Sequence, residues 1–417
     1  MIADHGVRFV LSVGVGLWVA RHLGANGFGQ LQYALALVTL VSVLGEAGVE
    51  SVVKRQLIAT PDAALKIIAG AVRLRLWGTG VSLATLALVW GLGAAAGGQV
   101  ELLLILAPIL MQPVMAVPEL WLHARLQGRE LAWPRWIALA GGAVARVAAI
   151  TMDASVSVFA IIVTIEVFLA AGVIALRARQ LGMKWSWAAA ELEHMRETMR
   201  LSLPLLLSGV AAVLYMKIDV VMLQQLKGAE MVGVYSAAVR LSEMTYFLPG
   251  IIATSVLPAL LRAKETSRTA YLQRFQRYFD LNSAAALGLA VGIAGAAPWL
   301  VTWGFGADYL AAVPVLQVHA WALPFVFLGV ARTQFLVDEK LGWFYFGSTG
   351  GGAAVNVTLN LWLIPSDGAI GAAVATVVSY AVAGWISSWF HPQVRSVAWA
   401  QTKALAIPLL GWRYLRR

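Results

Sequence analysis

The amino-acid sequence predicts an all-α membrane protein with about twelve transmembrane helices in two six-helix bundles. Composition is the first observation behind this prediction. Of the 417 residues, 60% are hydrophobic and only 12% are charged, whereas a soluble domain carries about 25% charged residues. The second is that apolar runs of about 20 residues, the length that crosses the hydrocarbon core, recur along the whole chain. The third is that Lys and Arg gather in alternate segments between these runs, as they do on the cytoplasmic side of membrane proteins.

The apolar runs define twelve expected spans. The first begins close to the N-terminus and slightly resembles a signal peptide, but further spans follow along the chain, so we interpret it as a retained helix. Residues 397–412 are few and include Lys403 and Pro408, which leaves open whether they lie at the membrane interface or form a partial span. The twelve expected spans are residues 6–22, 30–49, 76–96, 101–122, 134–151, 156–176, 202–225, 231–257, 281–303, 310–336, 342–364 and 368–390.

The basic residues predict the orientation of these spans. Most Lys and Arg lie in the segments that follow even-numbered spans and in the C-terminal tail, whereas the opposite segments hold only Arg21 and Lys227. Both termini are therefore predicted to be cytoplasmic. The formal net charge of +10 has the same cause. We predict no nucleic-acid partner, because these basic residues lie in short loops without an RNA-binding or helix-turn-helix pattern.

Two segments on the basic side are long enough for amphipathic helices on the membrane surface. They are residues 184–200, KWSWAAAELEHMRETMR, and residues 262–279. The first marks a junction between two halves of the chain. The expected organisation is an N-terminal six-helix bundle (1–180), a cytoplasmic amphipathic linker (181–200), a C-terminal six-helix bundle (201–391) and a cytoplasmic or interfacial tail (392–417).

An internal repeat supports the division into halves. The stretch LGANGFGQLQYALAL from Leu23 resembles LKGAEMVGVYSAAVRL from Leu226, and the two place Gly29 and Gly233 at the outer start of a helix. Six helices in each half give both halves the same orientation. This arrangement predicts a pseudo-two-fold axis along the membrane normal and a central cavity, which is transporter architecture.

Several kinds of chemistry are not indicated. The chain has no cysteine, so disulfides and thiolate metal sites are excluded. It has no phosphate-binding G-x-x-x-x-G-K-[ST] motif, no H-E-x-x-H zinc motif and no convincing catalytic triad. The outer loops, such as LKGAE and GFGAD, are short. We therefore expect no catalytic residue, no metal and no cofactor.

Ionisable and amide side chains inside the spans are the candidates for function, because such groups are costly in hydrocarbon and usually face a cavity or one another. The expected substrate-binding residues are Arg240, Lys217, Arg146, Arg332, Asn356 and Asn360. The candidates for binding a coupling ion are Asp219, Glu46 and Glu166.

Structural alternatives remain open for these residues. Arg240 can pair with Glu243 one turn further on, and Lys217 and Asp219 can neutralise charges on other helices. Arg332 can extend its guanidinium to the inner headgroups. The two asparagines can serve as hydrogen bonds between helices.

Prolines predict bent helices in two spans, one with Pro108, Pro113 and Pro118 and one with Pro314 and Pro324. Bent helices can move between inward-open and outward-open shapes. Static kinks explain the same residues equally well.

Two longer stretches carry a family resemblance. ARHLGANGFGQLQYALALVTLVSVLGEAGVESVVKRQL and DVVMLQQLKGAEMVGVYSAAVRLSEMTYFLPGIIATSVLPALLR resemble matching elements of the two halves of polysaccharide-transporter (Wzx-type) flippases. These flippases belong to the superfamily of multidrug, oligosaccharide-lipid and polysaccharide exporters. The similarity extends over nearly the whole chain through the order and spacing of spans, although lipid II flippases of the superfamily usually have two additional helices.

The resemblance implies a two-bundle fold that moves an undecaprenyl-pyrophosphate-linked glycan from the inner to the outer leaflet of the bacterial cytoplasmic membrane. It also implies a cationic central cavity. Asp219 in DVVML and Arg240 in YSAAVRL match the family pattern, and Arg332 matches it more weakly. The expected partners are the lipid-linked glycan, membrane lipids and other polysaccharide-assembly proteins.

Two other functions stay open at this point. A multidrug or organic-cation antiporter of the same fold would have an acidic, aromatic cavity, whereas Lys217, Arg240 and Arg146 favour an anion. A membrane glycosyltransferase or glycan ligase would typically need a sizeable exposed segment for its acceptor, which the short outer loops do not supply.

Overall fold

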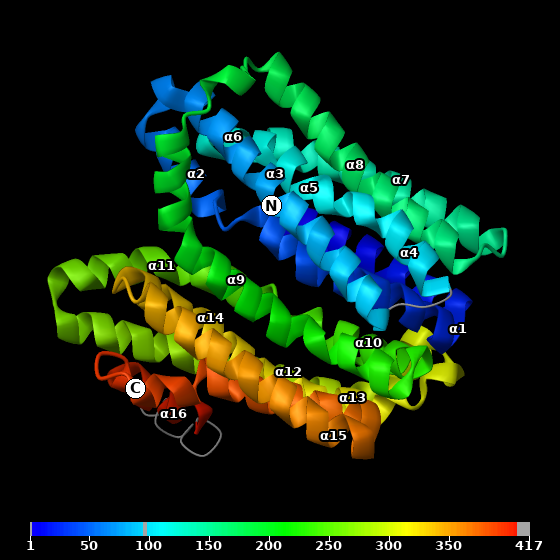
Figure 1. Ribbon diagram of the computed structural model, residues 1–417. Coiled ribbons are helices and arrows are strands. Elements are labelled where there is room, and N and C mark those ends of the chain that lie inside the picture. Colours follow the sequence, from blue (N-terminus) through cyan, green and yellow to red (C-terminus); the bar gives the residue numbers. More distant parts are fainter. Residues whose placement is uncertain (1, 95–97, 407–417) are drawn as a thin grey trace. The chain divides into compact units, whose positions relative to one another are not determined.

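The structure is a computed structural model that describes residues 2–94 and 98–406. These residues form helices and connecting turns, and the described chain contains no β-strand (Figure 1). The chain divides into two compact units, Met1–Val213 (unit 1) and Leu214–Arg417 (unit 2). The boundary falls inside helix α9 (Leu192–Lys227), later in the chain than the linker at residues 181–200 that the sequence suggested.

Unit 1 is built on the first eight helices and the first part of α9. Helix α1 packs against α3 and α7, and α7 packs against α8. A core of buried apolar side chains, including Val53, Ile68, Trp121 and Ile174, joins α2, α3, α6 and α8. The helices are α1 (Ile2–Glu46), α2 (Glu50–Ala59), α3 (Ala64–Val89), α4 (Gly98–Leu106), α5 (Gln112–Met115), α6 (Val117–Ala124), α7 (Gly128–Thr151) and α8 (Val156–Gln180).

Unit 2 contains the end of α9 and seven further helices. An aromatic core around Tyr271, Phe275, Tyr278 and Phe335 joins α12, α14 and α16. The helices are α10 (Ala229–Glu243), α11 (Leu248–Thr266), α12 (Arg268–Phe305), α13 (Ala312–His319), α14 (Leu323–Asp338), α15 (Gly342–Gly384) and α16 (Arg395–Leu405).

Three glycines give three turns one backbone conformation. Gly24 (φ 63°, ψ 175°), Gly228 (φ 86°, ψ 176°) and Gly306 (φ 95°, ψ 177°) all have positive φ, where a side chain would be strained. Each is followed by alanine and a polar residue, in the stretches GAN, GAE and GAD. The repeat seen from Leu23 and Leu226 therefore corresponds to a shared turn, and the turn recurs a third time before α13.

The helices account for all twelve expected spans. Eight described segments are long and apolar enough to cross a membrane. The segment Gly342–Phe390 holds two expected spans, and Gly14–Ala59 holds one span and the end of the span at residues 6–22, which begins earlier in α1. The two spans of each pair meet near non-helical glycines at 24 and 368. The remaining spans, 134–151 and 231–257, coincide with α7 and with α10 and α11. The predicted all-α, multi-pass membrane fold is confirmed.

The expected bends lie at the prolines. A 3-10 turn, Ala107–Met111, and a further break at Ala116 divide the fourth span into α4, α5 and α6, beside Pro108, Pro113 and Pro118. Another 3-10 turn, Ala320–Ala322, separates α13 from α14, just before Pro324.

The two segments expected to be surface helices are parts of longer helices in the structure. Residues 192–200 are instead the first turns of α9, which runs unbroken to Lys227 even though Pro204 lies inside it. Residues 262–279 are divided between the end of α11 and the start of α12, where the Ser267 hydroxyl accepts a hydrogen bond from the Ala270 amide at 3.1 Å. Capping by Ser267 favours a new helix at this point.

The C-terminal segment forms α16, which has 11 residues. At 1.5 Å per residue this helix is about 16 Å long, too short to cross about 30 Å of hydrocarbon. It buries Val397, Ala398 and Ala404 and packs against α12. Residues 407–412 of the predicted segment lie outside the described residues.

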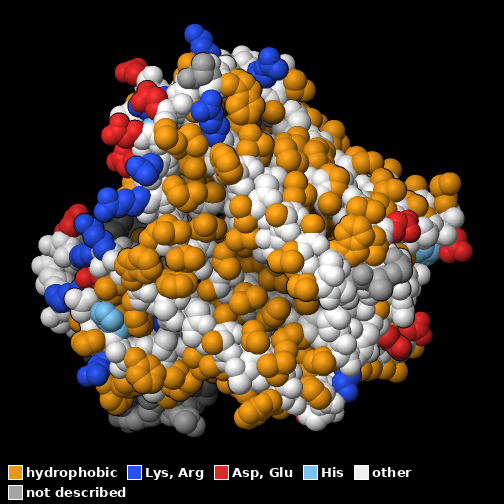
Figure 2. All heavy atoms as spheres, in the orientation of Figure 1, with side chains coloured by type: hydrophobic (Ala, Val, Ile, Leu, Met, Phe, Trp, Pro, Cys, Tyr) orange, Lys and Arg blue, Asp and Glu red, His pale blue; other side chains and the backbone are white. Residues whose placement is uncertain are grey.

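The visible surface agrees with a lipid environment. Figure 2 shows hydrophobic side chains over most of the face in view. Lys and Arg side chains gather near α2 in unit 1 and near the α11 end of unit 2.

Candidate functional site

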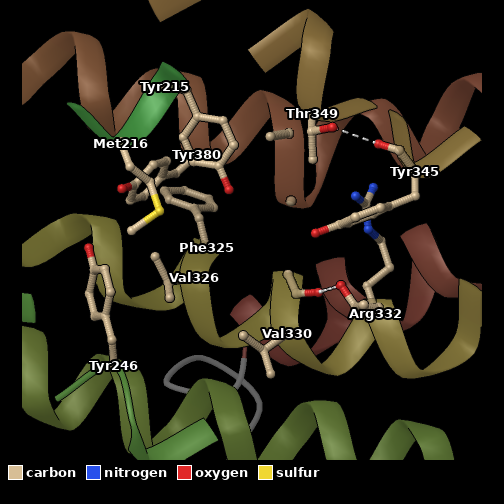
Figure 3. Close-up of a pocket in the computed structure, with 14 residues that line it drawn as sticks. Tyr215, Met216, Tyr246, Phe325, Val326, Val330, Arg332, Tyr345, Thr349 and Tyr380 are labelled. Atoms are coloured by element: carbon tan, nitrogen blue, oxygen red, sulfur yellow. Dashed lines mark hydrogen bonds between the residues drawn. The ribbon is translucent and has the colours of Figure 1, made fainter. Parts of the chain in front are cut away.

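Unit 2 contains a cavity of about 250 Å³ between α9, α14 and α15 (Figure 3). Polar and aromatic side chains supply much of its wall. The lining residues are Tyr215, Met216, Tyr246, Phe325, Val326, Gly329, Val330, Arg332, Thr333, Tyr345, Thr349, Tyr380, Ala383 and Gly384.

Glycines bring the two sides of this cavity together. A Cβ atom built on Gly384 would lie only 2.8 Å from the carbonyl oxygen of Phe325, and one on Gly329 would lie 3.7 Å from the Gly384 Cα. Helices α14 and α15 therefore approach each other backbone to backbone. Larger side chains are excluded from this contact, and Phe325 and Tyr380 fill the wall around it.

Arg332 is the charged residue of the cavity wall and is only 2% exposed. Its Nη1 donates hydrogen bonds to Ser387 Oγ at 2.8 Å and Ser388 Oγ at 3.1 Å, and its Nη2 donates to Ser348 Oγ at 3.0 Å. Its Nε has no partner, and no carboxylate forms an ion pair with it in the described part of the chain. A buried cation without a counterion costs several kcal/mol, so this position is suited to an anionic ligand.

Tyrosines form much of the rest of the wall. Tyr215 and Tyr380 pack edge to face, with ring centroids 5.2 Å apart. Figure 3 shows the Tyr215 and Tyr345 hydroxyls pointing toward the middle of the cavity, and the Arg332 guanidinium beside the Tyr345 ring. The cavity thus combines a cation, hydroxyl groups and aromatic faces.

Asp219 is the centre of a second buried cluster in unit 2. It is 2% exposed and accepts hydrogen bonds from the Tyr235 hydroxyl and, at 2.8 Å, from the Val220 amide. The Thr376 hydroxyl lies 3.1 Å from the same carboxylate and 2.9 Å from the Ala372 carbonyl oxygen. Because Thr376 has one hydroxyl proton, it can satisfy only one of these two acceptors. A proton on Asp219 would let both contacts form.

Lys217 lies two residues before Asp219 and pairs with Glu243. Their charged atoms are 3.8 Å apart, and the charge of Arg240 also acts on Glu243. The Glu243 carboxylate, which was expected to pair with Arg240, therefore interacts with two cations, Lys217 and Arg240. Next to Glu243 in the chain, Ser242 Oγ contacts Nδ1 of buried His319 at 2.6 Å.

The candidate residues of unit 1 form a separate group. Arg146 and Glu166 make an ion pair at 2.5 Å between α7 and α8. A side chain at Gly142 would collide with the Glu166 carboxylate, so this glycine provides the space for the pair. Outside the spans, a hydrogen bond from Arg177 lowers the pKa of Glu130.

Arg75 is a buried cation that sequence reasoning assigned to a loop. It lies inside α3, is 2% exposed and donates a hydrogen bond to the Pro113 carbonyl oxygen at 2.6 Å. The charges of Glu50, Glu46 and Glu119 act on it. The available signal was R-L-R at residues 73–75, because residues two apart on a helix point in different directions and the two arginines therefore meet different surroundings.

The two asparagines lie in the contact within α15. Both are fully buried. Asn356 donates to Ser379 Oγ at 3.3 Å, and Asn360 donates to Asn356 Oδ1 at 3.0 Å. The bond from Asn356 to Ser379 joins the two parts of α15 on either side of Gly368, whereas the bond from Asn360 to Asn356 lies within the first part. Neither asparagine lines the cavity.

The sequence-predicted residues are thus distributed over several places. Arg332 alone among them lines the cavity, Lys217, Asp219 and Arg240 lie on α9 and α10, and Glu46, Arg146 and Glu166 belong to unit 1. The tyrosines of the cavity were not predicted, because aromatic residues in apolar helices carry no distinguishing pattern. Among the described residues, no group of three or more His, Asp or Glu side chains is arranged to hold a metal ion.

Solved structures show which fold this is. A structure described as the lipid II flippase MurJ in an inward closed conformation matches with a TM-score of 0.71 and 15% identity, over 99% of this chain and 93% of that one. An inward-facing multidrug resistance MATE family transporter of the MOP superfamily matches with a TM-score of 0.68 and 17% identity, over 96% and 95%. A MOP superfamily transporter from Pyrococcus furiosus, described as having a binding pocket of reverse polarity, matches with a TM-score of 0.64 and 14% identity, over 97% and 94%.

Sequence comparison identifies the family. The curated proteins give no match. The model of the family described as "Polysaccharide biosynthesis protein" matches residues 4–264. The resemblance to polysaccharide transporters of the multidrug, oligosaccharide-lipid and polysaccharide exporter superfamily is confirmed by this match together with the fold. Because the match covers more than half of the chain, the chain belongs to the polysaccharide biosynthesis protein family.

Proposed function

We propose that this protein is a flippase for undecaprenyl-pyrophosphate-linked oligosaccharide, which it moves from the inner to the outer leaflet of the bacterial cytoplasmic membrane. The cargo is a repeat unit of O-antigen, capsule or exopolysaccharide. The observation that carries the proposal is the Arg332 guanidinium, which is buried in the wall of an aromatic cavity. Its hydrogen-bond partners are serine hydroxyls, and it has no carboxylate partner in the described chain. In a chain of a polysaccharide biosynthesis family, the anion that suits this cation is the phosphate of a lipid-linked glycan.

The chemistry of the cargo agrees with this function. A diphosphate does not cross hydrocarbon unaided, so a carrier needs a wet cavity with buried cations, and the lipid tail can stay in the bilayer. Arg240, Lys217 and Arg146 are further proposed substrate contacts, and Asn356 and Asn360 contribute through the packing of α15. The function is transport, with no catalytic step. We expect other polysaccharide-assembly proteins to supply and remove the glycan.

A multidrug or organic-cation antiporter is the second candidate. The tyrosines of the cavity favour it, because aromatic faces attract organic cations. Arg332 opposes it, since a fixed cation on the same wall would repel a cationic drug. Reconstituted protein that moves lipid-linked glycan between leaflets supports the flippase, and movement of organic cations alone supports the antiporter.

The orientation gives a prediction about topology. A reporter that is active only outside the cytoplasm is expected to be active when fused after Gly98 or Gly306, and inactive when fused near Arg268, because basic segments stay in the cytoplasm. Enzyme activity of the fusions in intact cells measures this. Activity near Arg268 combined with silence at the two glycines would contradict cytoplasmic termini.

Asp219 is the proposed site of the coupling ion, with Glu46 and Glu166 as further candidates. Asp219→Asn keeps the shape of the side chain and its hydrogen-bond acceptor for Tyr235 but cannot bind a proton or pair with sodium. We expect the variant to fold and insert normally and to lose gradient-dependent transport. Flipping in vesicles with and without an imposed ion gradient measures this, with Glu230→Gln, an exposed acid of α10, as the control. Equal stimulation of Asp219→Asn and wild-type protein by the gradient would reject coupling at this residue.

A further inference from the structure

The donors of Arg332 are incompletely used. A guanidinium has five N–H groups, and the serine hydroxyls of Ser348, Ser387 and Ser388 accept three of them. The Nε–H has no acceptor, and Nη2 has a second hydrogen beyond the one given to Ser348. Nε, which is buried, and Nη2 form one edge of the guanidinium, and the two N–H groups of such an edge are the fork that binds two oxygens of one phosphate.

The rest of the wall has a different chemistry. Tyr215 and Tyr345 direct hydroxyls toward the middle of the cavity, as Figure 3 shows, and Thr333 and Thr349 also line it. Tyrosine presents both an apolar ring face and a polar tip. A sugar ring has the matching surfaces, with C–H groups on its faces and hydroxyls around its rim. A lipid tail has no donor or acceptor and could not form hydrogen bonds with these hydroxyl groups.

The size of the cavity limits the ligand. Its volume of about 250 Å³ is below the ~300–1,000 Å³ of pockets for drug-sized ligands. A phosphate with one sugar ring is of suitable size, whereas a complete repeat unit with its lipid is far too large. The cavity is thus suited to one part of the cargo.

On these grounds we propose that the cavity of unit 2 is a subsite for a hexose 1-phosphate group, with the phosphate on the open edge of Arg332 and the sugar ring among the tyrosines. This inference rests on the proposed function, since it identifies the group as the first sugar and adjoining phosphate of the lipid-linked glycan. Arg332, Tyr215 and Tyr345 would then recognise the junction between lipid carrier and glycan. The rest of the glycan and the lipid would lie outside the cavity.

The test is calorimetric titration of the purified full-length protein in detergent. The probes are glucose 1-phosphate, galactose 1-phosphate, N-acetylglucosamine 1-phosphate, inorganic phosphate, glucose and a short-chain phosphatidylglycerol. At least one hexose 1-phosphate is expected to bind at least about tenfold more tightly than inorganic phosphate, glucose or the phospholipid, because it fills both parts of the cavity. Equal affinity for inorganic phosphate would show a plain anion site, and tighter binding of phosphatidylglycerol would show a headgroup site. Either result overturns the proposal.

Variants separate the two contacts. Arg332→Gln removes the charge and is expected to weaken hexose 1-phosphate binding at least about tenfold. Tyr345→Leu is expected to remove the advantage of the hexose 1-phosphate over inorganic phosphate while phosphate still binds. Arg268→Gln, an arginine of α12 that pairs with Glu339 at 2.5 Å outside the cavity, is the control and should bind like the wild type. If Arg332→Gln fails to fold, Tyr345→Leu and Tyr215→Phe still test the sugar contact, and an unchanged preference in both would reject it.

Flipping measured on the same variants separates this inference from the proposed function. Loss of hexose 1-phosphate binding with normal flipping would reject the subsite and leave the flippase standing. Binding by a wild-type protein that does not flip lipid-linked glycan would leave a sugar-phosphate site and reject the function.

Discussion

Replacing Arg240 with alanine is expected to reduce flipping by at least about tenfold, with lipid-linked glycan building up in the inner leaflet. Arg240 is one turn from the end of α10 and half-buried, in the stretch YSAAVRL that matches the family pattern. A charge-assisted hydrogen bond to phosphate contributes about 1.5–3 kcal/mol, which corresponds to roughly ten- to a hundredfold. Arg240→Lys is expected to recover only part of the rate, because lysine keeps the charge but lacks the planar fork.

Glu243 provides the control for Arg240. Its carboxylate already pairs with Lys217 at 3.8 Å, so Glu243→Gln alone should retain most of the flipping. If Arg240 serves only to balance Glu243, the double variant Arg240→Met, Glu243→Gln should regain activity that Arg240→Ala lacks. An active double variant would therefore rule out Arg240 as a substrate contact.

Replacing Arg75 with methionine is expected to destabilise unit 1 strongly. The guanidinium is 2% exposed, and it is hydrogen-bonded to Pro113 at a break in the fourth span. Its removal leaves the Pro113 carbonyl oxygen without this donor and removes a charge that acts on Glu50, Glu46 and Glu119. A buried acceptor left without a donor costs about 1–3 kcal/mol, which lowers the melting temperature of a unit of this size by roughly 2–10 °C.

The matched control for Arg75 is Arg73→Met. Arg73 lies on the same helix, is partly exposed and donates to the carbonyl oxygens of Trp187 and Ala190 at 2.7 and 3.4 Å. Thermal unfolding of the purified protein in detergent should show a small change for Arg73→Met and a large one for Arg75→Met. Equal melting temperatures for the two variants would show that the buried position of Arg75 has no special energetic role.

The sequence determined the fold class because apolar length and basic loops are strong signals in a membrane protein. The positions of the prolines also predicted the broken fourth and tenth spans. The sequence pattern did not predict that long helices begin at Leu192 and Arg268. An amphipathic segment next to a span has the polarity expected of a separate surface helix, and polarity was the only signal used. In the structure the polar segment from Leu192 is the start of α9, whose residues from Leu201 onward are mostly apolar, and Pro204 lies inside this helix.

The candidate site was only partly predictable. Buried charges at Asp219 and Arg332 were visible as ionisable residues inside apolar runs, but their partners come from distant helices. Asp219 meets Tyr235 and Thr376, and Arg332 meets three serines that carry no charge. Hydroxyl partners leave no pattern in the sequence. Arg75 was missed for a different reason. It lies in a stretch rich in charged residues, where an exposed side chain is expected, yet its side chain is buried.

The most direct test of the central claim is the distribution of lipid-linked oligosaccharide between the leaflets of proteoliposomes that contain the purified protein. Undecaprenyl-pyrophosphate-linked glycan is placed in one leaflet, and its appearance in the other is followed with an enzyme or lectin that cannot enter the vesicle. The account predicts movement in vesicles with wild-type protein, and movement reduced to the level of protein-free vesicles with Arg332→Gln. Wild-type vesicles that transport organic cations but leave the glycan in its original leaflet would contradict it.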